Sequence, residues 1–334
     1  MNKKTVILLA LLLILGIVGF KMYQQNAQMS TGASNSRQFK VEDISNVDRI
    51  FVADKNASII DLNKKNGKWY LKDGIEADQF FVDYLLKTIN KIEVINLVPK
   101  AAIPRVMNEI GTLGLKVEIY DGKKLVKSYY VGMGNPTGET TYMVLNRFNI
   151  PYEVSIPGFD GDLRSRYWPL SQTDLISRVL AEYPINSIRK VSVDYPRNKS
   201  ESFILTVKGS KSYDLEPFYS TTTKIESPVK PGEVEAFLAG FEKMYGAKAF
   251  TKNEMSSDTM ISEIPFLNLQ ITGSDDVVRK LIMYPVINTE QEGQRVDLEH
   301  RPFNFFVTLD DRLFFYAQED QLKKIFFGYS FFFK

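Results

Sequence analysis

Most of the chain after residue 39 consists of short runs in which apolar and polar residues alternate, separated by turn residues such as Asn66-Gly67 and Asp121-Gly122. Alternation with a period of two indicates β-strands with one buried face. Asn-Gly and Asp-Gly are the pairs that tight hairpin turns prefer. We therefore predict mostly antiparallel sheet, with strands or hairpins at residues 47–54, 58–62, 67–71, 115–132, 141–146, 151–156, 188–195, 202–208, 211–215, 266–286 and 304–317.

Two segments, residues 76–92 and 230–246, carry apolar residues at every third or fourth position instead. This spacing predicts amphipathic helices, and Pro231 falls in the first turn of the second, where its missing N–H costs nothing. The residues that we expect to be buried are Phe81, Leu85 and Ile89, with Phe80 and Tyr84 beside them, and Val234, Phe237, Leu238, Phe241 and Tyr245. Those expected to face solvent in the first helix are Asp83, Lys87 and Asn90.

The order strand, strand, strand, helix, hairpin, hairpin occurs twice, with corresponding features roughly 140 to 150 residues apart. The pattern predicts an α+β protein with two tandem units of mostly antiparallel sheet and one main helix each. The expected bounds are 39–165 for the first unit, 166–184 for the joining segment and 185–334 for the second unit.

The N-terminus has a different pattern, with Lys3 and Lys4 followed by an uninterrupted apolar run over Thr5–Phe20. Such a run is either the core of a signal peptide or a slightly short transmembrane helix. Basic and aromatic residues follow it where cleavage needs small ones, which favours an uncleaved anchor at residues 1–23 and a flexible tether at 24–38. The positive-inside rule then leaves the N-terminus in the cytoplasm and predicts a single-pass inner-membrane protein with its bulk in the periplasm. The alternative is a cleaved signal peptide and a soluble exported protein.

Composition narrows the possible functions. The chain has 42 basic and 40 acidic residues, so that beyond Lys3 and Lys4 it is formally neutral, which argues against nucleic acid as a partner. It contains no cysteine, which excludes disulfides, thiolate metal sites and a lipid-modified cysteine. His300 is the only histidine and stands in a charged loop-like stretch. We therefore predict no catalytic, cofactor-binding or metal-binding residues, and no enzyme.

A glycine cluster at Gly132, Gly134 and Gly138 is the nearest thing to a functional motif. A phosphate-binding loop needs Lys and Ser or Thr after its last glycine and then a helix, whereas Glu139 and a predicted strand follow here. We therefore interpret the segment as a strand connection, with a contact loop as the alternative. Its candidate contact residues are Asn135, Pro136 and Thr137.

A second candidate site consists of Arg164, Arg166 and Trp168. Two guanidinium groups at alternating positions, with an aromatic ring two residues on, can hold a carboxylate or a phosphate. The alternative is that the segment packs the two halves together, with Trp168 buried and the arginines paired with acids. The aromatic C-terminus, residues 322–334, is expected to dock on its own unit or on a partner, because it would otherwise promote aggregation.

Five segments together carry a family resemblance: residues 47–54, 66–74, 76–94, 117–144 and 156–159. They resemble the bacterial envelope proteins of domain-of-unknown-function family 4340, which is common in Bacteroidota. The likeness covers residues 39–167 well and the second half by pattern only. It implies an exported, membrane-attached protein of the kind that some bacteria encode beside ABC transporter components similar to those linked with gliding motility. Many members look like lipoproteins, from which this cysteine-free chain departs.

These observations predict a non-enzymatic, membrane-anchored extracytoplasmic adaptor or scaffold of a bacterial envelope complex, such as one associated with an ABC transporter or with gliding motility. Its expected partners are other envelope or inner-membrane proteins, and no cofactor is expected. Two alternatives stay open. One is an extracytoplasmic binding protein for a saccharide, peptide or anionic ligand, and the other is a carboxylate-dependent hydrolase whose acidic residues are distant in sequence.

Overall fold

The computed structural model describes residues 16, 39–72, 74–169, 172–250, 264–286 and 295–333. Apart from Gly16, the predicted anchor at 1–23 and the predicted tether at 24–38 lie outside these residues. Within the described part of the chain, no helix combines the length and the apolar character that a membrane crossing requires.

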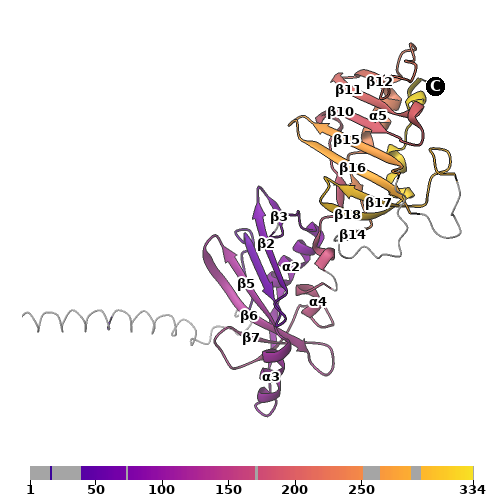
Figure 1. The fold of residues 1–334 in the computed structure, drawn as a ribbon. Helices are drawn as coiled ribbons and strands as arrows, with labels where there is room; N and C mark the ends of the chain where they lie inside the picture. The colour runs from indigo at the N-terminus through magenta and orange to yellow at the C-terminus, as the bar shows by residue number, and fades with distance from the viewer. Residues whose placement is uncertain are drawn as a thin grey trace, which may run out of the picture. The chain divides into compact units, whose positions relative to one another are not determined.

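Two eight-stranded sheets form the framework of the described chain (Figure 1). The first contains β1 (Arg49–Ala53), β2 (Ile59–Lys65), β3 (Lys68–Tyr70), β4 (Glu93–Leu97), β5 (Leu115–Asp121), β6 (Lys124–Gly134), β7 (Thr141–Leu145) and β8 (Tyr152–Ser155). The second contains β10 (Ile188–Asp194), β11 (Phe203–Gly209), β12 (Ser212–Pro217), β14 (Lys248–Phe250), β15 (Leu267–Gly273), β16 (Val278–Pro285), β17 (Asn304–Leu309) and β18 (Leu313–Gln318). A further pair is formed by β9 (Val179–Ala181) and β13 (Met244–Tyr245).

The helices are few and short. Within the described residues from 39 onward, the α-helices are α2 (Gln79–Lys91), α3 (Ile103–Leu113), α4 (Arg164–Tyr167), α5 (Pro231–Ala239) and α6 (Glu319–Leu322). The 3₁₀ turns are η2 (Gln172–Leu175), η3 (Ile185–Ser187), η4 (Lys199–Glu201), η7 (Lys323–Ile325) and η8 (Tyr329–Phe333).

The two sheets have the same strand order. The first runs β3-β2-β1-β5-β6-β7-β8-β4 and the second β12-β11-β10-β15-β16-β17-β18-β14, so each strand of one has a counterpart at the same place in the other. Neighbouring strands pair antiparallel in both, as between β5 and β6 and between β15 and β16. The predicted architecture of mostly antiparallel sheet in two similar units is therefore confirmed at this level.

The sequence pattern missed several elements, among them β4, β14 and α3. The strands β4 and β14 each follow the main helix and pair with the last strand of their sheet, β8 and β18. Both are edge strands; the five residues of β4 do not alternate between buried and exposed positions, and β14 has three residues. The helix α3 also makes the prediction of one main helix per unit wrong for the first unit; it has a proline in its first turn and buries Val106 and Ile110.

Internal contacts divide the chain into two compact units. The first comprises the described residues up to Lys64 together with Asp83–Trp168, and the second comprises Lys65–Val82 and Pro169–Lys334. The segment Lys65–Val82 therefore groups with the second unit, although the sequence assigned it to the first. Within the second unit, the amide of Asp78 donates to the carbonyl of Leu175 at 2.7 Å, and this bond helps to hold the segment there.

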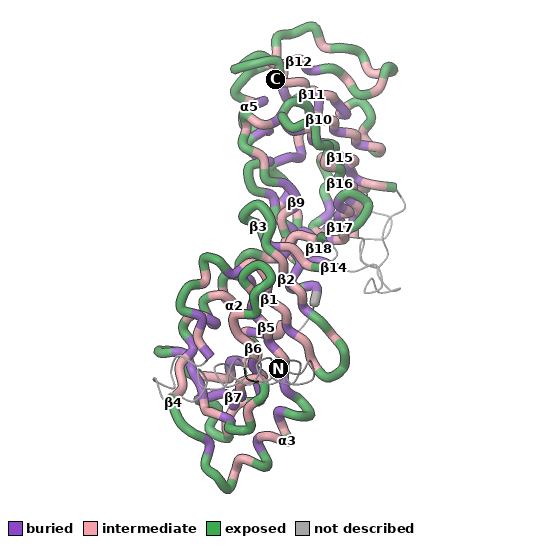
Figure 2. The backbone as a smooth tube through the Cα atoms, turned by 90° about the vertical axis from the view of Figure 1, so that its left-hand side faces the viewer, coloured by how far each residue is buried: buried purple, intermediate pink, exposed green. Residues whose placement is uncertain are grey.

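Burial alternates as predicted along β1 and β15, whereas β7 buries four residues in a row (Figure 2). The helix α2 departs from its predicted pattern at three positions. Leu85 and Ile89 are fully buried as expected, but Val82 is buried in place of Phe81, and Phe80 is 77% exposed. Asn90, which we expected in solvent, is half-buried and donates to the carbonyls of Val41 and Glu42. These two hydrogen bonds link the helix to the chain that precedes β1.

The core of the second unit is aromatic. Val234, Phe237, Leu238 and Phe241 are fully buried as predicted, whereas Tyr245 lies in β13 and is 41% exposed, so its place on the helix stripe was wrong. The C-terminal residues Tyr329 and Phe332 are buried in the same core, and the Phe332 ring lies 5.0 Å from that of Phe203. The prediction that the aromatic C-terminus docks on its own unit is confirmed.

Candidate functional site

The glycine segment is the connection between the antiparallel strands β6 and β7, as predicted. Asn135 fixes its shape: its side-chain oxygen accepts from the Thr137 hydroxyl at 3.0 Å and from the Glu139 amide at 3.1 Å. Gly138 has a φ of +76°, which glycine adopts without steric cost. Pro136 and Thr137 are exposed, as is Glu139, so the loop offers these side chains for contact.

The glycines of β6 lie against α3 and Asp162, and Gly132 permits close packing. A Cβ added to Gly132 would lie 2.8 Å from Ile110 Cγ1 and 2.9 Å from the carbonyl oxygen of Tyr142. A Cβ added to Gly134 would meet the side chain of Asp162 at 3.4 Å. Gly132 therefore lets α3 approach the strand closely, whereas a Cβ at Gly134 would make an ordinary van der Waals contact with Asp162.

Asp162 brings the two predicted contact segments together. Its Oδ1 accepts from the Thr141 hydroxyl at 2.9 Å and from the Arg164 amide at 2.8 Å, while the Leu163 amide donates to Thr141 Oγ1 at 2.7 Å. The start of β7, just after the glycine loop, is thereby joined to the start of α4, which carries Arg164 and Arg166. Sequence reasoning did not select Asp162, because nothing near it in the sequence shows that it bonds to Thr141.

The Arg166 guanidinium is held between two aromatic rings. Its carbon lies 3.8 Å from the ring centroid of Phe159 and 4.1 Å from that of Tyr84, which comes from α2. Stacking of this kind contributes about 0.5–2 kcal/mol and fixes the plane of the guanidinium. The buried Nε of Arg166 has no hydrogen-bond partner among the described residues.

The Arg164 side chain forms no ion pair in the described part of the chain, although Asp162 and Asp54 lie near enough to act on its charge. Its buried Nη1 makes no hydrogen bond there. Burial lowers the pKa of Arg164, and the charges of Asp162 and Asp54 oppose this effect. Trp168 is half-buried. The structure therefore differs from the alternative that the sequence left open, in which Trp168 is buried and both arginines are paired with acids. The two guanidinium groups are partly buried and can receive a carboxylate or phosphate oxygen.

A buried tyrosine pair supports α4. The hydroxyls of Tyr129 on β6 and Tyr167 on α4 are 3.0 Å apart, and both side chains are fully buried. Burial raises the pKa of both phenols, so they stay protonated and neutral at any ordinary pH. The pair anchors α4 to the sheet, and with it the arginines.

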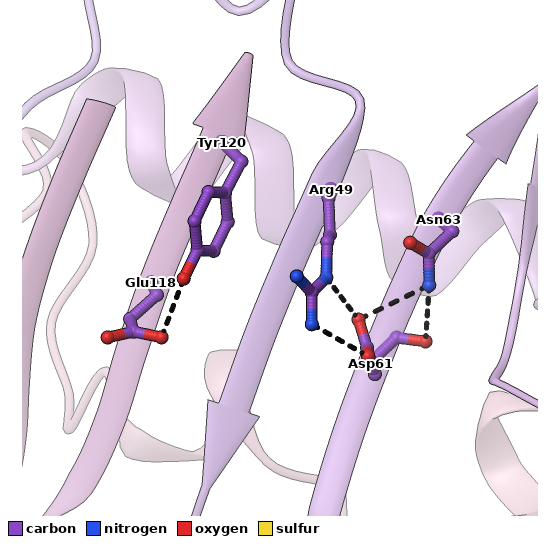
Figure 3. Close-up of polar contacts among 5 residues, drawn as sticks. All are labelled: Arg49, Asp61, Asn63, Glu118 and Tyr120. Carbon is purple, nitrogen blue, oxygen red and sulfur yellow. Dashed lines mark hydrogen bonds and ion pairs between the residues drawn. The ribbon is translucent and has the colours of Figure 1, made fainter. Parts of the chain in front are cut away.

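A polar network lies on the less buried face of β2, β1 and β5, the face opposite the one that packs into the core (Figure 3). Arg49 donates to both carboxylate oxygens of Asp61, at 2.8 and 3.0 Å, and Asn63 donates to Asp61 Oδ1 at 3.2 Å. On β5, the Tyr120 hydroxyl donates to Glu118 at 2.8 Å, and the Arg49 guanidinium lies 5.1 Å from the Tyr120 ring centroid. In the sequence, these residues occupy the polar positions of the alternating pattern that predicted each strand.

The charges of this network compensate one another. Burial raises the pKa of Glu118, but hydrogen bonds from Lys116 and Tyr120 outweigh burial and leave the pKa below its ordinary value. Lys116 contacts Glu118 at 2.7 Å, while the pKa of Arg49 is raised by its bond to Asp61. We interpret the network as a support for the sheet, because each acid already holds a cation.

The three groups Asp297, Glu299 and His300 lie close enough together to suggest a metal site. However, Asp297 Oδ1 already accepts from the Glu299 amide at 3.0 Å and from the His300 amide and ring at 2.9 and 3.0 Å. Its other oxygen pairs with Arg295. A cation would have to displace Arg295, so the cluster is better explained as a turn closed by a buried aspartate.

The Asp297 turn predicts a pH dependence. Burial raises the pKa of Asp297, but the bonds from His300 and Glu299 and the charge of Arg295 outweigh this and lower the pKa from 3.8 to about 2. A lowered folded-state pKa stabilises the fold above pH ~4, and this stability is lost as pH falls through the folded value. We expect Asp297→Asn to cost about 1–3 kcal/mol at neutral pH and to remove that acid-dependent loss.

Urea unfolding across the pH range is the measurement for this prediction. Asp276→Asn is the matched control, because Asp276 is an exposed turn residue paired with Arg189, and the change should stay within about 0.5 kcal/mol. Equal acid sensitivity in the native chain and in Asp297→Asn would contradict the assignment.

A cavity of about 450 Å³ lies in the second unit, and every residue that lines it belongs to that unit. Its lining carries charges of both signs, and two pairs form among them: Lys68 contacts Glu76 at 3.1 Å, and Arg279 contacts Asp310 at 3.6 Å. The cavity therefore offers mixed charge without a preference for one kind of ligand.

Comparisons of the chain with protein-family models, with curated proteins and with solved structures return no match. The structure itself defines the class as an α+β protein with two eight-stranded antiparallel sheets of one strand order. The family resemblance described from the sequence stays a prediction.

Proposed function

We propose that this protein is a non-enzymatic, membrane-anchored adaptor or scaffold on the extracytoplasmic side of a bacterial inner membrane, in an envelope complex such as an ABC-type exporter. The observation that carries the proposal is the repetition of one eight-strand order in both sheets. A repeated module offers partners a series of similar surfaces, as repeat proteins do.

The chemistry of the described residues supports this proposal. The single histidine, His300, is bonded to Asp297 in a closed turn, and the carboxylates Asp61 and Glu118 are each paired with a cation. In contrast, Pro136 and Thr137 stand exposed on a loop that Asn135 holds in shape. A rigid, exposed loop tip is a common place for recognition.

Photocrosslinking in intact cells tests the adaptor function. A photoreactive amino acid at Thr137 should join the chain to the same inner-membrane protein in repeated experiments, as identified by mass spectrometry. The control position is Lys211, an exposed turn residue in the second unit with a φ of +55°. Recovery of the chain always alone, from Thr137 and from other exposed positions, would contradict the proposal.

A second function is favoured by the Arg164 and Arg166 geometry: binding of an anionic ligand on the extracytoplasmic side. The supporting observation is the Arg166 guanidinium, which lies against the rings of Phe159 and Tyr84 and whose buried Nε has no hydrogen-bond partner among the described residues. A pre-oriented guanidinium loses little entropy when a carboxylate or phosphate binds.

Thermal unfolding with citrate or inorganic phosphate tests the anion site. A ligand at a hundred times its Kd adds about 2.7 kcal/mol to the unfolding free energy, which appears as a higher Tm. We expect this shift in the native chain and its loss in Arg166→Gln, with Arg189→Gln as the control because Arg189 is exposed and paired with Asp276. A shift that is equal in all three proteins reflects general salt stabilisation and would contradict a site at Arg166.

A further inference from the structure

Three exposed apolar side chains gather at one corner of the first sheet. Ile95 and Leu97 on β4 are 50% and 58% exposed, and Ile150, just before β8, is 50% exposed. Leu97 lies opposite Tyr152 in the pairing of β4 with β8, and the Val98 amide donates to the Pro151 carbonyl at 3.4 Å. This pairing brings Leu97 to the end of β8 that Ile150 precedes, and Ile95 is two residues before Leu97 on the same edge strand; these three residues are here named the β4 corner.

The form of β4 argues against a partner strand as the occupant of this surface. β4 is the last strand of the sheet, so one of its edges is unpaired within that sheet. The pairing with β8 shifts register between Val94 and Asn96, which places an irregularity at Ile95. Such a bulge disturbs the hydrogen-bonding edge and blocks the addition of another strand. The corner thus offers apolar side chains rather than a regular backbone edge.

The chain enters the first unit at the same corner. Phe39, where the description of the body begins, is fully buried, and its ring centroid lies 5.8 Å from that of Tyr152, the cross-strand partner of Leu97. The predicted tether at 24–38 separates Phe39 from the predicted anchor. If the tether has no fixed structure, a chain of that length spans roughly 20 Å on average. The anchor would therefore keep the β4 corner near the bilayer surface.

Two exposed cations flank the corner in the sequence. Lys100 follows Leu97 by three residues, and Arg147 precedes Ile150 by three. Neither takes part in an ion pair within the described part of the chain. Exposed cations beside apolar side chains are the combination that binds an anionic membrane interface, where the apolar groups enter and the cations meet lipid phosphates.

We propose that the β4 corner contacts the surface of the phospholipid bilayer, with Ile95, Leu97 and Ile150 in the interfacial layer and Lys100 and Arg147 on anionic headgroups. This inference rests on the membrane attachment in the proposed function. It assigns the first unit a fixed face toward the membrane and leaves its other surfaces for protein partners.

Single-cysteine probes test the contact, since the chain contains no cysteine of its own. The full chain carrying Leu97→Cys is labelled with an environment-sensitive fluorophore and reconstituted into vesicles of phosphatidylethanolamine and phosphatidylglycerol. We expect a blue shift and quenching by nitroxide-labelled lipid. Val277→Cys, at a turn of the second unit and 56% exposed, is the matched control and should show neither. Adding Ile95→Ser and Ile150→Ser should weaken the quenching at position 97 about fivefold for each change.

Carbonate extraction of the same vesicles separates the two proposals. A chain that stays in the membrane without quenching at position 97 would overturn the corner contact and leave the attachment standing. A chain that carbonate removes would overturn both. A blue shift that needs no lipid, together with a disulfide between two copies at position 97, would show a second copy as the occupant and would also overturn the contact. Urea midpoints of the variants confirm that each is folded.

Discussion

Phe237→Ala is expected to destabilise the second unit by about 3–5 kcal/mol, because it removes the ring at the centre of the aromatic core. Phe237 is fully buried on α5, and its ring centroid lies 5.1 Å from that of Phe241 and 5.4 Å from that of Phe203. The C-terminal ring of Phe332 lies 5.7 Å from it. The truncation therefore leaves a cavity and also loosens the last residues of the chain.

Urea unfolding and limited proteolysis of the C-terminus measure the two effects. We expect a lower unfolding free energy together with faster cleavage after Lys323 and Lys324. Phe303→Ala is the matched control, because Phe303 is 74% exposed and its loss should change stability by less than about 0.5 kcal/mol. Similar costs for the two substitutions would show that the aromatic cluster is not the core of this unit.

Gly132→Ala is expected to cost about 1–3 kcal/mol through overpacking. The added methyl group would lie 2.8 Å from Ile110 Cγ1 and 2.9 Å from the carbonyl of Tyr142. The side chain of Ile110 can move, but the backbone of β7 can do so only by disturbing its pairing with β6. The prediction separates a packing role from a ligand-binding role for this glycine motif.

A double-mutant cycle with Ile110→Ala provides the measurement. Removing the Ile110 side chain opens space for the new methyl group, so the two changes together should cost less than the sum of their separate effects. Gly138→Ala is the comparison: its cost of about 1–2 kcal/mol comes from a φ of +76°, with no atom within 4 Å of the new Cβ. Its cost should add to that of Ile110→Ala, and strict additivity for Gly132 as well would refute the packing argument.

Local pattern was sufficient for most strands and turns. In the hairpin of β17 and β18, for example, Asp310 and Asp311 have φ values of +50° and +55°, as a tight turn requires. The length of α5 was not predictable in the same way. The stripe continues to Tyr245 in sequence, but the helix ends at Ala239, and a Cβ on the following Gly240 would lie 2.8 Å from Ile325. The segment around Ile325, distant in sequence, therefore leaves no room for a side chain at the end of α5.

The candidate site shows a similar division. Arg164 and Arg166 were recognisable as a pair of cations, and Asn135 to Thr137 as a loop. The ring stack on Arg166 comes from α2 and from the turn that precedes α4, and Asp162 connects β7 with α4. None of these contacts follows a local period, so no reading of neighbouring residues could have found them.

By itself, the sequence determined the antiparallel class, the repeated order of elements and most turn positions, because these depend on periodicity and on backbone preferences within a few residues. It also determined the chemical limits set by one histidine and no cysteine. Only the tertiary structure decided the edge strands β4 and β14, the burial of Val82 in place of Phe81, and the pairing state of each charged group. These depend on which surfaces meet in three dimensions, since burial and electrostatic pairing are properties of contacts between distant segments.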